Sequence, residues 1–240
     1  GQVHFSWTGE KHQLYTMLPA LKQYLIESVK PITANMEKRG GGVLDINLID
    51  LTHEISDYYQ LLVTFETKDS MGANFINSVL EEFGQSLKVF MASQVQLSDE
   101  DRQVEIIMAI LSNYTPECVV KTCVECPLHL LDNVDERLDG ESFARKFEKA
   151  VKIAHVDVYR ATTHNKGIYN GIDAVAIATG NDFRAIEAAG HAYASRNGRY
   201  ESLSRVEIED GMFRFVLEVP MAMGTVGGLT SLHPLAKQSL

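Results

Sequence analysis

Residues 159–190 read YRATTHNKGIYNGIDAVAIATGNDFRAIEAAG and place a lysine, Lys166, among small and polar residues just before an apolar run. The run ends at Gly180-Asn181-Asp182, where either polar residue is typical of a helix N-cap. We therefore expect a helix over 183–194, and its positive end favours the ionised form of Asp182. The stretch combines a cation with an anion at the far end of an apolar segment.

Several polar residues lie near Lys166 in the sequence. Arg160 lies six positions before it, and Asn165 and Asn170 flank it. Such side chains together are suited to hold a carboxylate, and a partly desolvated lysine stabilises a developing oxyanion. A lysine of this kind needs a counter-charge to stay protonated, and Asp182 supplies one. The residues taken alone also fit a surface lysine in a loop, so both interpretations stay open.

The composition of the chain limits the kinds of protein it can be. The chain has 240 residues, 45% of them hydrophobic and 22% charged, as is ordinary for a globular protein with a real core. Twenty-two basic against 32 acidic residues give a net charge of -10, which argues against a partner of duplex nucleic acid but not against a small anionic ligand. Because no apolar run reaches the length of a membrane span and no signal-peptide pattern opens the chain, we expect a cytoplasmic protein without a membrane partner.

Strands and helices are mixed along the chain without a regular βαβ rhythm, which predicts an α+β fold. The helical stretch after the first strand is expected to be interrupted or begun afresh at Pro19. The hairpin signal is Asp210-Gly211 between two alternating runs. A compact first unit is expected to end near residue 112. Predicted strands lie near 3–7, 43–50, 58–68, 104–111 and 118–126, and predicted helices near 70–90, 141–155 and 183–194.

Two further glycine-bearing loops precede helices. In Asp69–Asn74 we expect Asp69 to be the N-cap and Gly72 to lie in the first turn, where free backbone N–H groups attract phosphate. Spacing alone favours a plain capped helix, because this is not the G-x-G-x-x-G fingerprint. In Gly224–Gly228, adjacent glycines suit a close approach to a ligand or a simple turn.

Three cysteines, Cys118, Cys123 and Cys126, are spaced C-x4-C-x2-C, which imitates the start of an iron–sulfur ligand set. A strand would put Cys118 and Cys126 on one face and Cys123 on the other, and no fourth cysteine exists. We therefore favour reduced strand cysteines over a metal site. An iron–sulfur electron carrier is kept as a rival function, which an iron-free, colourless protein would exclude.

Five separated motifs, in the same order, make the chain similar to the bacterial-type (class II) 3-hydroxy-3-methylglutaryl-coenzyme A (HMG-CoA) reductases. They are RGGG, KDSMGANFIN, ILSNY, the long segment from Tyr159 to Ala194, and GTVGGLTSLHPLA. The likeness spans essentially the whole chain. It implies a small ferredoxin-like α/β sandwich that binds NAD(P), residues 1–112, followed by part of a larger α+β domain for HMG-CoA, residues 113–240.

The resemblance also implies an activity and partners. Family members use NADH or NADPH to reduce HMG-CoA to mevalonate and coenzyme A, or run the reverse reaction, as homodimers with the active site at the subunit interface. In the matching positions, Lys166 stabilises the oxyanion and Asp182 pairs with the lysine and tunes its proton. The substrate-binding positions are Arg160, which takes the free carboxylate, and Asn165, Asn170 and Asn113.

Cofactor contacts follow from the second motif, which lies along the dinucleotide and maps onto Asp69, Met71, Gly72 and Asn74. Asp45, after the glycine triplet, is a candidate partner for the ribose 2′-hydroxyl, where an acidic group would repel a 2′-phosphate. The choice between NADH and NADPH stays open at this point.

The family also uses a catalytic glutamate from a segment before residue 1 and a histidine from a mobile C-terminal segment, and His233 does not stand in that context. Since removal of members of a catalytic unit costs orders of magnitude in rate, we expect little turnover from the 240-residue chain alone. A non-catalytic module that binds dinucleotide or acyl-CoA is the alternative, and measured turnover against measured binding separates the two.

Overall fold

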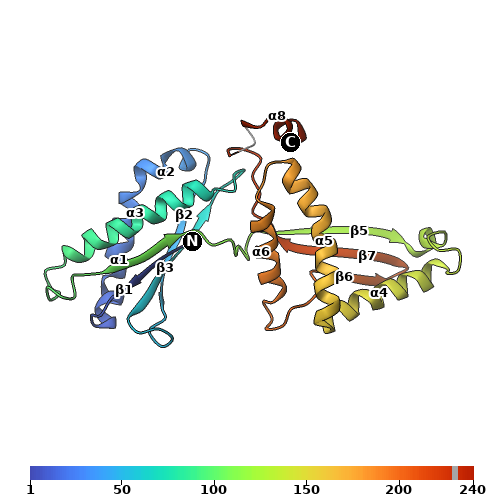
Figure 1. The fold of residues 1–240 in the computed structure, drawn as a ribbon, viewed down its shortest axis with the longest axis horizontal. Helices are drawn as coiled ribbons and strands as arrows, with labels where there is room; N and C mark the ends of the chain where they lie inside the picture. Colours follow the sequence, from blue (N-terminus) through green and yellow to red (C-terminus); the bar gives the residue numbers. More distant parts are fainter. Residues whose placement is uncertain (229–231) are drawn as a thin grey trace. The chain divides into compact units, whose positions relative to one another are not determined.

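The computed structural model describes residues 1–228 and 232–240 and divides the chain into two compact units, Gly1–Ser112 and Asn113–Leu240. Each unit has its own antiparallel sheet and its own helices (Figure 1). The α+β class predicted from the mixed pattern is confirmed. Within the described residues, no helix is both long enough and apolar enough to span a membrane.

The first unit builds a four-stranded sheet in the order β2-β3-β1-β4, with helices between the strands. Its apolar core joins inward-facing strand residues such as Phe5 and Leu61 to helix residues such as Leu21 and Phe83, all fully buried. The elements are β1 Gln2–Ser6, α1 Lys11–Ser28, α2 Lys30–Glu37, β2 Gly42–Asp50, β3 Tyr58–Glu66, α3 Ala73–Ala92 and β4 Glu105–Ile110.

The single tryptophan, Trp7, belongs to this core. Its ring is 2% exposed, packs edge-on against Tyr59, and donates from Nε1 to the backbone oxygen of Asp101 at 2.6 Å. The hydrogen bond satisfies the one polar atom of a buried indole, which fixes the residues after β1 against the segment before β4.

Pro19 does not interrupt the first helix, contrary to the prediction. Helix α1 runs through it from Lys11 to Ser28, and the chain breaks only at Val29. Buried apolar residues lie three or four positions apart on both sides of the proline, so packing of the whole face outweighs the lost backbone hydrogen bond. These residues are Leu14, Met17, Leu21 and Leu25.

The second unit builds a three-stranded sheet in the order β5-β7-β6, all neighbours antiparallel. The predicted hairpin is confirmed, since Asp210 and Gly211 have φ of 50° and 74°, as a type I′ turn requires. The elements are β5 Val119–Pro127, η1 Leu128–Leu131, α4 Gly140–Val156, α5 Val158–Ala178, α6 Phe183–Ala194, β6 Ser204–Glu209, β7 Met212–Pro220 and α8 Pro234–Ser239.

Helix α5 is the element that the sequence pattern did not predict, because two glycines and several β-branched residues weaken its helix propensity. It starts where Asp157 Oδ1 accepts a hydrogen bond from the backbone N–H of Tyr159 at 3.0 Å. Its buried residues, Ala161, Asn165, Tyr169 and Ala176, lie four or seven positions apart and share one face of the helix. Tertiary packing, rather than propensity, holds this helix.

Candidate functional site

The open face of α5 carries the predicted catalytic lysine. Lys166 and Asn170 are both exposed and lie one helical turn apart, so their side chains share a face. Neither side chain forms an ion pair or hydrogen bond with any residue in the described part of the chain. The helix thus presents, on one exposed face, an ammonium group without an ion-pair partner in the described residues and a neighbouring amide.

Arg160 lies about 120° around the helix from Lys166 and roughly 9 Å along its axis. It makes no ion pair among the described residues. One turn later, His164 Nε2 lies 2.6 Å from the hydroxyl of Ser204. Burial lowers the pKa of His164 below its ordinary value, and the nearby charges of Arg160 and His155 lower it further. Arg160 therefore lies near a partly buried histidine that is hydrogen-bonded to Ser204.

Asn165 is fully buried, and its expected role as a substrate contact stays a prediction. Its Nδ2 donates to the backbone oxygen of Glu201 at 3.0 Å, and its Oδ1 accepts from the backbone N–H of Leu203 at 3.1 Å. Both polar atoms of the Asn165 amide thus form hydrogen bonds that join α5 to the segment before β6. Lys166 is the next residue, and the rotation of about 100° per residue along the helix places its side chain on the exposed side.

Asp182, rather than Asn181, caps α6, since its Oδ1 accepts from the backbone N–H of Ala185 at 3.0 Å. Asn181 has another role, which sequence reasoning missed. Its Nδ2 donates to the backbone oxygen of Gly224 at 3.1 Å, and its Oδ1 accepts from the Gly224 N–H at 2.8 Å. This two-way clamp brings the 180–182 turn and the 224–228 loop together, and Gly227 and Gly228 there have positive φ.

Lys166 and Asp182 are not brought together within one chain in this structure. From Lys166 the helix continues for twelve residues to Ala178, which corresponds to roughly 18 Å of axial rise. No ion pair joins the two side chains. The predicted catalytic pair thus consists of a lysine in the middle of α5 and an aspartate that lies beyond the end of α5, at the start of α6.

In the first unit the dinucleotide motif surrounds the start of α3. The N-cap is Gly72, with φ of 84° and no side-chain cap, which corrects the expectation that Asp69 caps the helix. A tight turn at Thr67–Ser70, closed by a 3.1 Å bond from Ser70 N–H to the Thr67 oxygen, delays the helix to Ala73. The first turn of α3 carries no acidic residue, so the free backbone N–H groups at this end of the helix can bind an anion.

The glycine triplet lies beside this loop. Gly42 pairs with Glu66 at the end of β3, and a Cβ on Gly41 would approach the Glu66 oxygen to 2.4 Å. A Cβ on Gly40 would lie 3.4 Å from Cε of Lys68. The structure therefore joins two motifs that are separated in sequence. Around them, Asp69 and Asn74 are exposed and Met71 is partly buried.

Asp45 lies on β2 next to a shift in the strand register and is already engaged. Lys22 Nζ lies 3.1 Å from its Oδ1, and the backbone N–H of Ile46 and the Asn47 amide also donate to the carboxylate. The hydrogen bond from Lys22, followed by that from Ile46, lowers the pKa of Asp45. Its carboxylate is thus partly neutralised within the unit.

The remaining expected residues lie apart from these groups. Asn113 is exposed in the segment before β5. Cys123 and Cys126 are three positions apart on β5 and project to opposite faces, and Cys123 is exposed.

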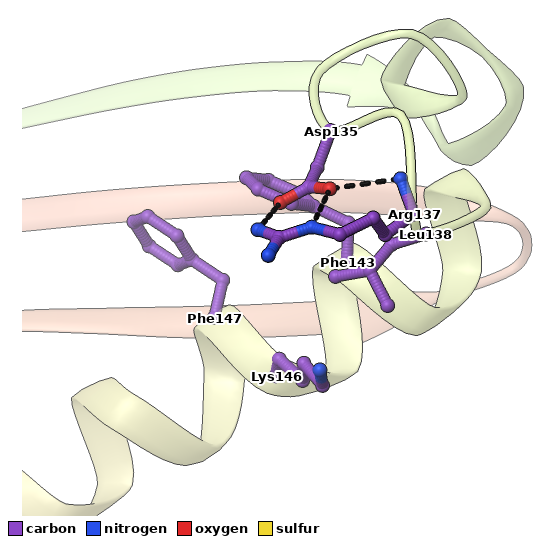
Figure 2. Close-up of a pocket in the computed structure, with 6 residues that line it drawn as sticks. All are labelled: Asp135, Arg137, Leu138, Phe143, Lys146 and Phe147. Atoms are coloured by element: carbon purple, nitrogen blue, oxygen red, sulfur yellow. Dashed lines mark hydrogen bonds and ion pairs between the residues drawn. The ribbon is translucent and has the colours of Figure 1, made fainter.

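A cavity of about 540 Å³ lies under α4 (Figure 2). Phe143, Phe147 and Leu138 form its apolar wall, and Asp135 and Arg137 are bonded to each other across 2.9 and 3.1 Å. None of the predicted site residues lines it. Its acid and base satisfy each other, while the side chain of Lys146, which also lines the cavity, forms no ion pair with any residue that the structure describes.

Comparison with known proteins places these observations in a family. The family described as hydroxymethylglutaryl-coenzyme A reductase matches residues 1–239. The 3-hydroxy-3-methylglutaryl-coenzyme A reductase of Archaeoglobus fulgidus is 33% identical over 220 residues, which cover 91% of this chain and 46% of that protein. A probable 3-hydroxy-3-methylglutaryl-coenzyme A reductase from Borreliella burgdorferi is 32% identical over 208 residues, which cover 85% of this chain and 44% of that protein. The chain thus spans about half the length of these relatives.

Solved structures agree. The class II reductase of Streptococcus pneumoniae, determined with NADPH bound in open conformations, matches with a TM-score of 0.84 and 34% identity over 99% of this chain and 61% of that one. Another structure of the same enzyme gives the same score and identity, with 54% of its chain covered. The chain therefore belongs to the hydroxymethylglutaryl-coenzyme A reductase family.

Proposed function

We propose that this chain takes part in the NAD(P)H-dependent reduction of HMG-CoA to mevalonate and coenzyme A, or in the reverse reaction. The observation that carries the proposal is the uncommitted Lys166 on the open face of α5, next to Asn170 and inside the longest family motif. Family membership supplies the reaction, and the geometry supplies a cation that no partner in the described chain has neutralised.

In this reaction the nicotinamide supplies hydride to the thioester carbonyl carbon. Negative charge then develops on the carbonyl oxygen, and the Lys166 ammonium group donates a hydrogen bond to that oxygen. Arg160, with a long side chain of its own, takes the free carboxylate of the substrate, and Asn170 orients the carbonyl end. Breaking of the C–S bond would release coenzyme A as a thiolate, which takes up a proton, and the resulting aldehyde would accept hydride from a second NAD(P)H and a proton to give mevalonate.

The counter-charge of Lys166 comes, in this proposal, from a second subunit. Roughly 18 Å of helix separates Lys166 from the end of α5, so Asp182 of the same chain is out of reach unless α5 rearranges. A homodimer with its site at the subunit interface, as the family resemblance implies, would let Lys166 of one subunit meet Asp182 of its partner.

Subunit mixing tests this arrangement. In a chain as long as the matched relatives, Lys166→Ala and Asp182→Ala should each be inactive alone. In a dimer of one of each, one site would be doubly altered and the other intact, so an equimolar mixture should recover about a quarter of the parent activity. If the pair forms within one chain, every site in the mixture is defective and nothing is recovered.

The first unit is proposed to be the NAD(P) domain. Its β-α-α-β-β-α-β order and β2-β3-β1-β4 sheet fit a ferredoxin-like sandwich, the topology implied by the resemblance. The pyrophosphate would lie at the start of α3, where no side chain caps the helix and the first turn carries no acidic residue. The roles assigned to Asp69, Met71 and Asn74 stay proposals of the same kind.

The test is HMG-CoA-dependent oxidation of NADH and NADPH, followed by absorbance, on this chain and on a chain as long as the matched relatives. Calorimetric titration of both dinucleotides and of coenzyme A runs in parallel. Turnover that Lys166→Ala abolishes supports the reductase. Binding without turnover in both chains would favour the non-catalytic module, and turnover that survives Lys166→Ala would contradict the assigned role.

A further inference from the structure

Two lysine–aspartate ion pairs join helix α1 to β2, the outer strand of the first unit's sheet. Lys11 Nζ lies 2.5 Å from Asp50 Oδ2, and Lys22 Nζ lies 3.1 Å from Asp45 Oδ1. The two lysines are eleven positions apart on the helix, and the two aspartates are five positions apart on the strand, each a span of roughly 17 Å. Because these spans match, α1 runs alongside β2 in the opposite direction.

The two ion pairs lie toward different ends of the ladder between β2 and β3. Asp45 follows Gly42 by three positions, so it lies toward the end where the glycine triplet approaches the loop before α3. Asp50 is opposite Tyr59 at the other end of the ladder. The carboxylate of Asp45 is therefore roughly 10 Å along the strand from the glycines that border the place proposed for the pyrophosphate.

The choice of dinucleotide depends on the charge at this place. NADH and NADPH differ only at the 2′ position of the adenosine ribose, which carries a hydroxyl in one and a phosphate in the other. An ionised carboxylate accepts a hydrogen bond from the hydroxyl, whereas it repels the phosphate, which carries a charge of about −1.5 to −2 at pH 7. Asp45 taken alone therefore favours NADH.

The hydrogen bonds of Asp45 change this preference. Its Oδ1 accepts from Lys22 Nζ and from the backbone N–H of Ile46, and its Oδ2 accepts from Asn47 Nδ2. A ribose hydroxyl would compete with these three donors. The Lys22 ammonium group has three N–H donors, and the bond to Asp45 is the one it forms within the described residues, so it has donors left for a phosphate.

We propose that Lys22 determines the dinucleotide choice of this chain: by pairing with Asp45 near the ribose end of the proposed cofactor site, it lets the first unit bind NADPH, which an unpaired Asp45 would repel. Lys22 acts through Asp45 and is thus a positioning residue for the 2′-phosphate. This inference rests on the proposed role of the first unit as the NAD(P) domain, and it adds the class of ligand, a dinucleotide with a phosphate at the ribose 2′ position.

Calorimetric titration of the 240-residue chain with NADPH and with NADH tests the role of Lys22. Lys22→Gln leaves the Asp45 carboxylate unpaired, so the Kd of NADPH should rise at least about tenfold while the Kd of NADH falls. Adding Asp45→Asn to Lys22→Gln removes the unpaired carboxylate and should lower the Kd of NADPH again by at least about threefold. Far-UV circular dichroism checks that each variant is folded.

Lys11→Gln is the matched control, because it removes the same charge from the same helix and leaves an aspartate of the same strand unpaired, at the end away from the glycine triplet. Its ratio of the two Kd values should stay within about twofold of the parent. A parent that binds neither dinucleotide would overturn the NAD(P) assignment and this inference together. If the parent binds NADPH but Lys22→Gln behaves like Lys11→Gln, or if Asp45→Asn brings no recovery, the assignment stands and the role of Lys22 is refuted.

Discussion

Gly190 offers the sharpest test of the packing between α5 and α6. A Cβ at this position would lie 1.4 Å from Oη of Tyr169 and 2.7 Å from its Cζ, and Tyr169 is only 1% exposed. A gap that small cannot be relieved by a shift of a few tenths of an ångström, so Gly190→Ala must drive the ring out of its site. Loss of a buried aromatic ring from its packing costs about 3–5 kcal/mol, and the gain in helix propensity returns about 1 kcal/mol.

The expected net loss is about 2–4 kcal/mol in the free energy of unfolding, or a fall of about 1–2 M in the urea midpoint for a slope near 2 kcal/mol/M. Far-UV circular dichroism follows the transition. Gly84→Ala in α3 is the matched control, because its nearest neighbour, Ile106 Cγ2, would lie at 3.4 Å and the helix gains propensity. That variant should be as stable as the parent or up to about 1 kcal/mol more stable.

A second substitution separates the hydroxyl from the ring. The Tyr169 hydroxyl is buried without a hydrogen-bond partner in the described chain, so Tyr169→Phe should change stability by no more than about 0.5 kcal/mol or should stabilise. In the Gly190→Ala background it removes the closest clash and should restore at least about 1 kcal/mol. If Gly190→Ala proves as stable as Gly84→Ala, the two helices do not pack as described.

Three further outcomes follow from the same helix. Asn165→Ala removes two buried hydrogen bonds to backbone groups and should destabilise by about 2–4 kcal/mol in urea titrations, whereas Asn170→Ala should stay within about 0.5 kcal/mol while lowering HMG-CoA turnover. Gly167→Ala meets open space and should raise unfolding free energy by about 1 kcal/mol; a fall in turnover in this stabler variant would mark close approach of substrate to the α5 backbone. Because the folded-state pKa of His164 is lowered, the unfolded chain binds more protons below about pH 6.5, so stability should fall as pH drops through that range, and less steeply in His164→Gln when midpoints are compared between pH 7.5 and 5.5.

Local signals predicted much of the fold. The Asp210-Gly211 turn and the helix that starts after Asp182 were predicted because a two-residue turn and an N-cap are decided by the residues themselves. The predicted break at Pro19 was wrong, because burial of the apolar face of α1 stabilises the helix by more than the proline destabilises it. Helix α5 was not predicted for the same reason, since its two glycines favour a loop, whereas tertiary packing, such as that of Tyr169 against Gly190, favours a helix.

Some residues of the candidate site could be identified from the sequence, and the placement of others depends on the fold. Residue type and motif identified Lys166 and Arg160, and the structure leaves both without a partner among the residues it describes. Burial of Asn165 depends on which face of α5 turns inward, which no short motif encodes. The start of α3 at Gly72 instead of Asp69 depends on the intervening turn. The Asn181 clamp on Gly224 joins residues 43 positions apart and lies beyond any local pattern.

The buried indole of Trp7 gives the chain a built-in spectroscopic reporter. As the single tryptophan, it lies wholly in the first unit, so the red shift of its emission on exposure to water follows the melting of that unit alone. Circular dichroism sums over both units. A difference between the two transitions would therefore measure directly how far the units unfold independently, and substitutions at Gly190 should move the dichroism curve without moving the emission curve.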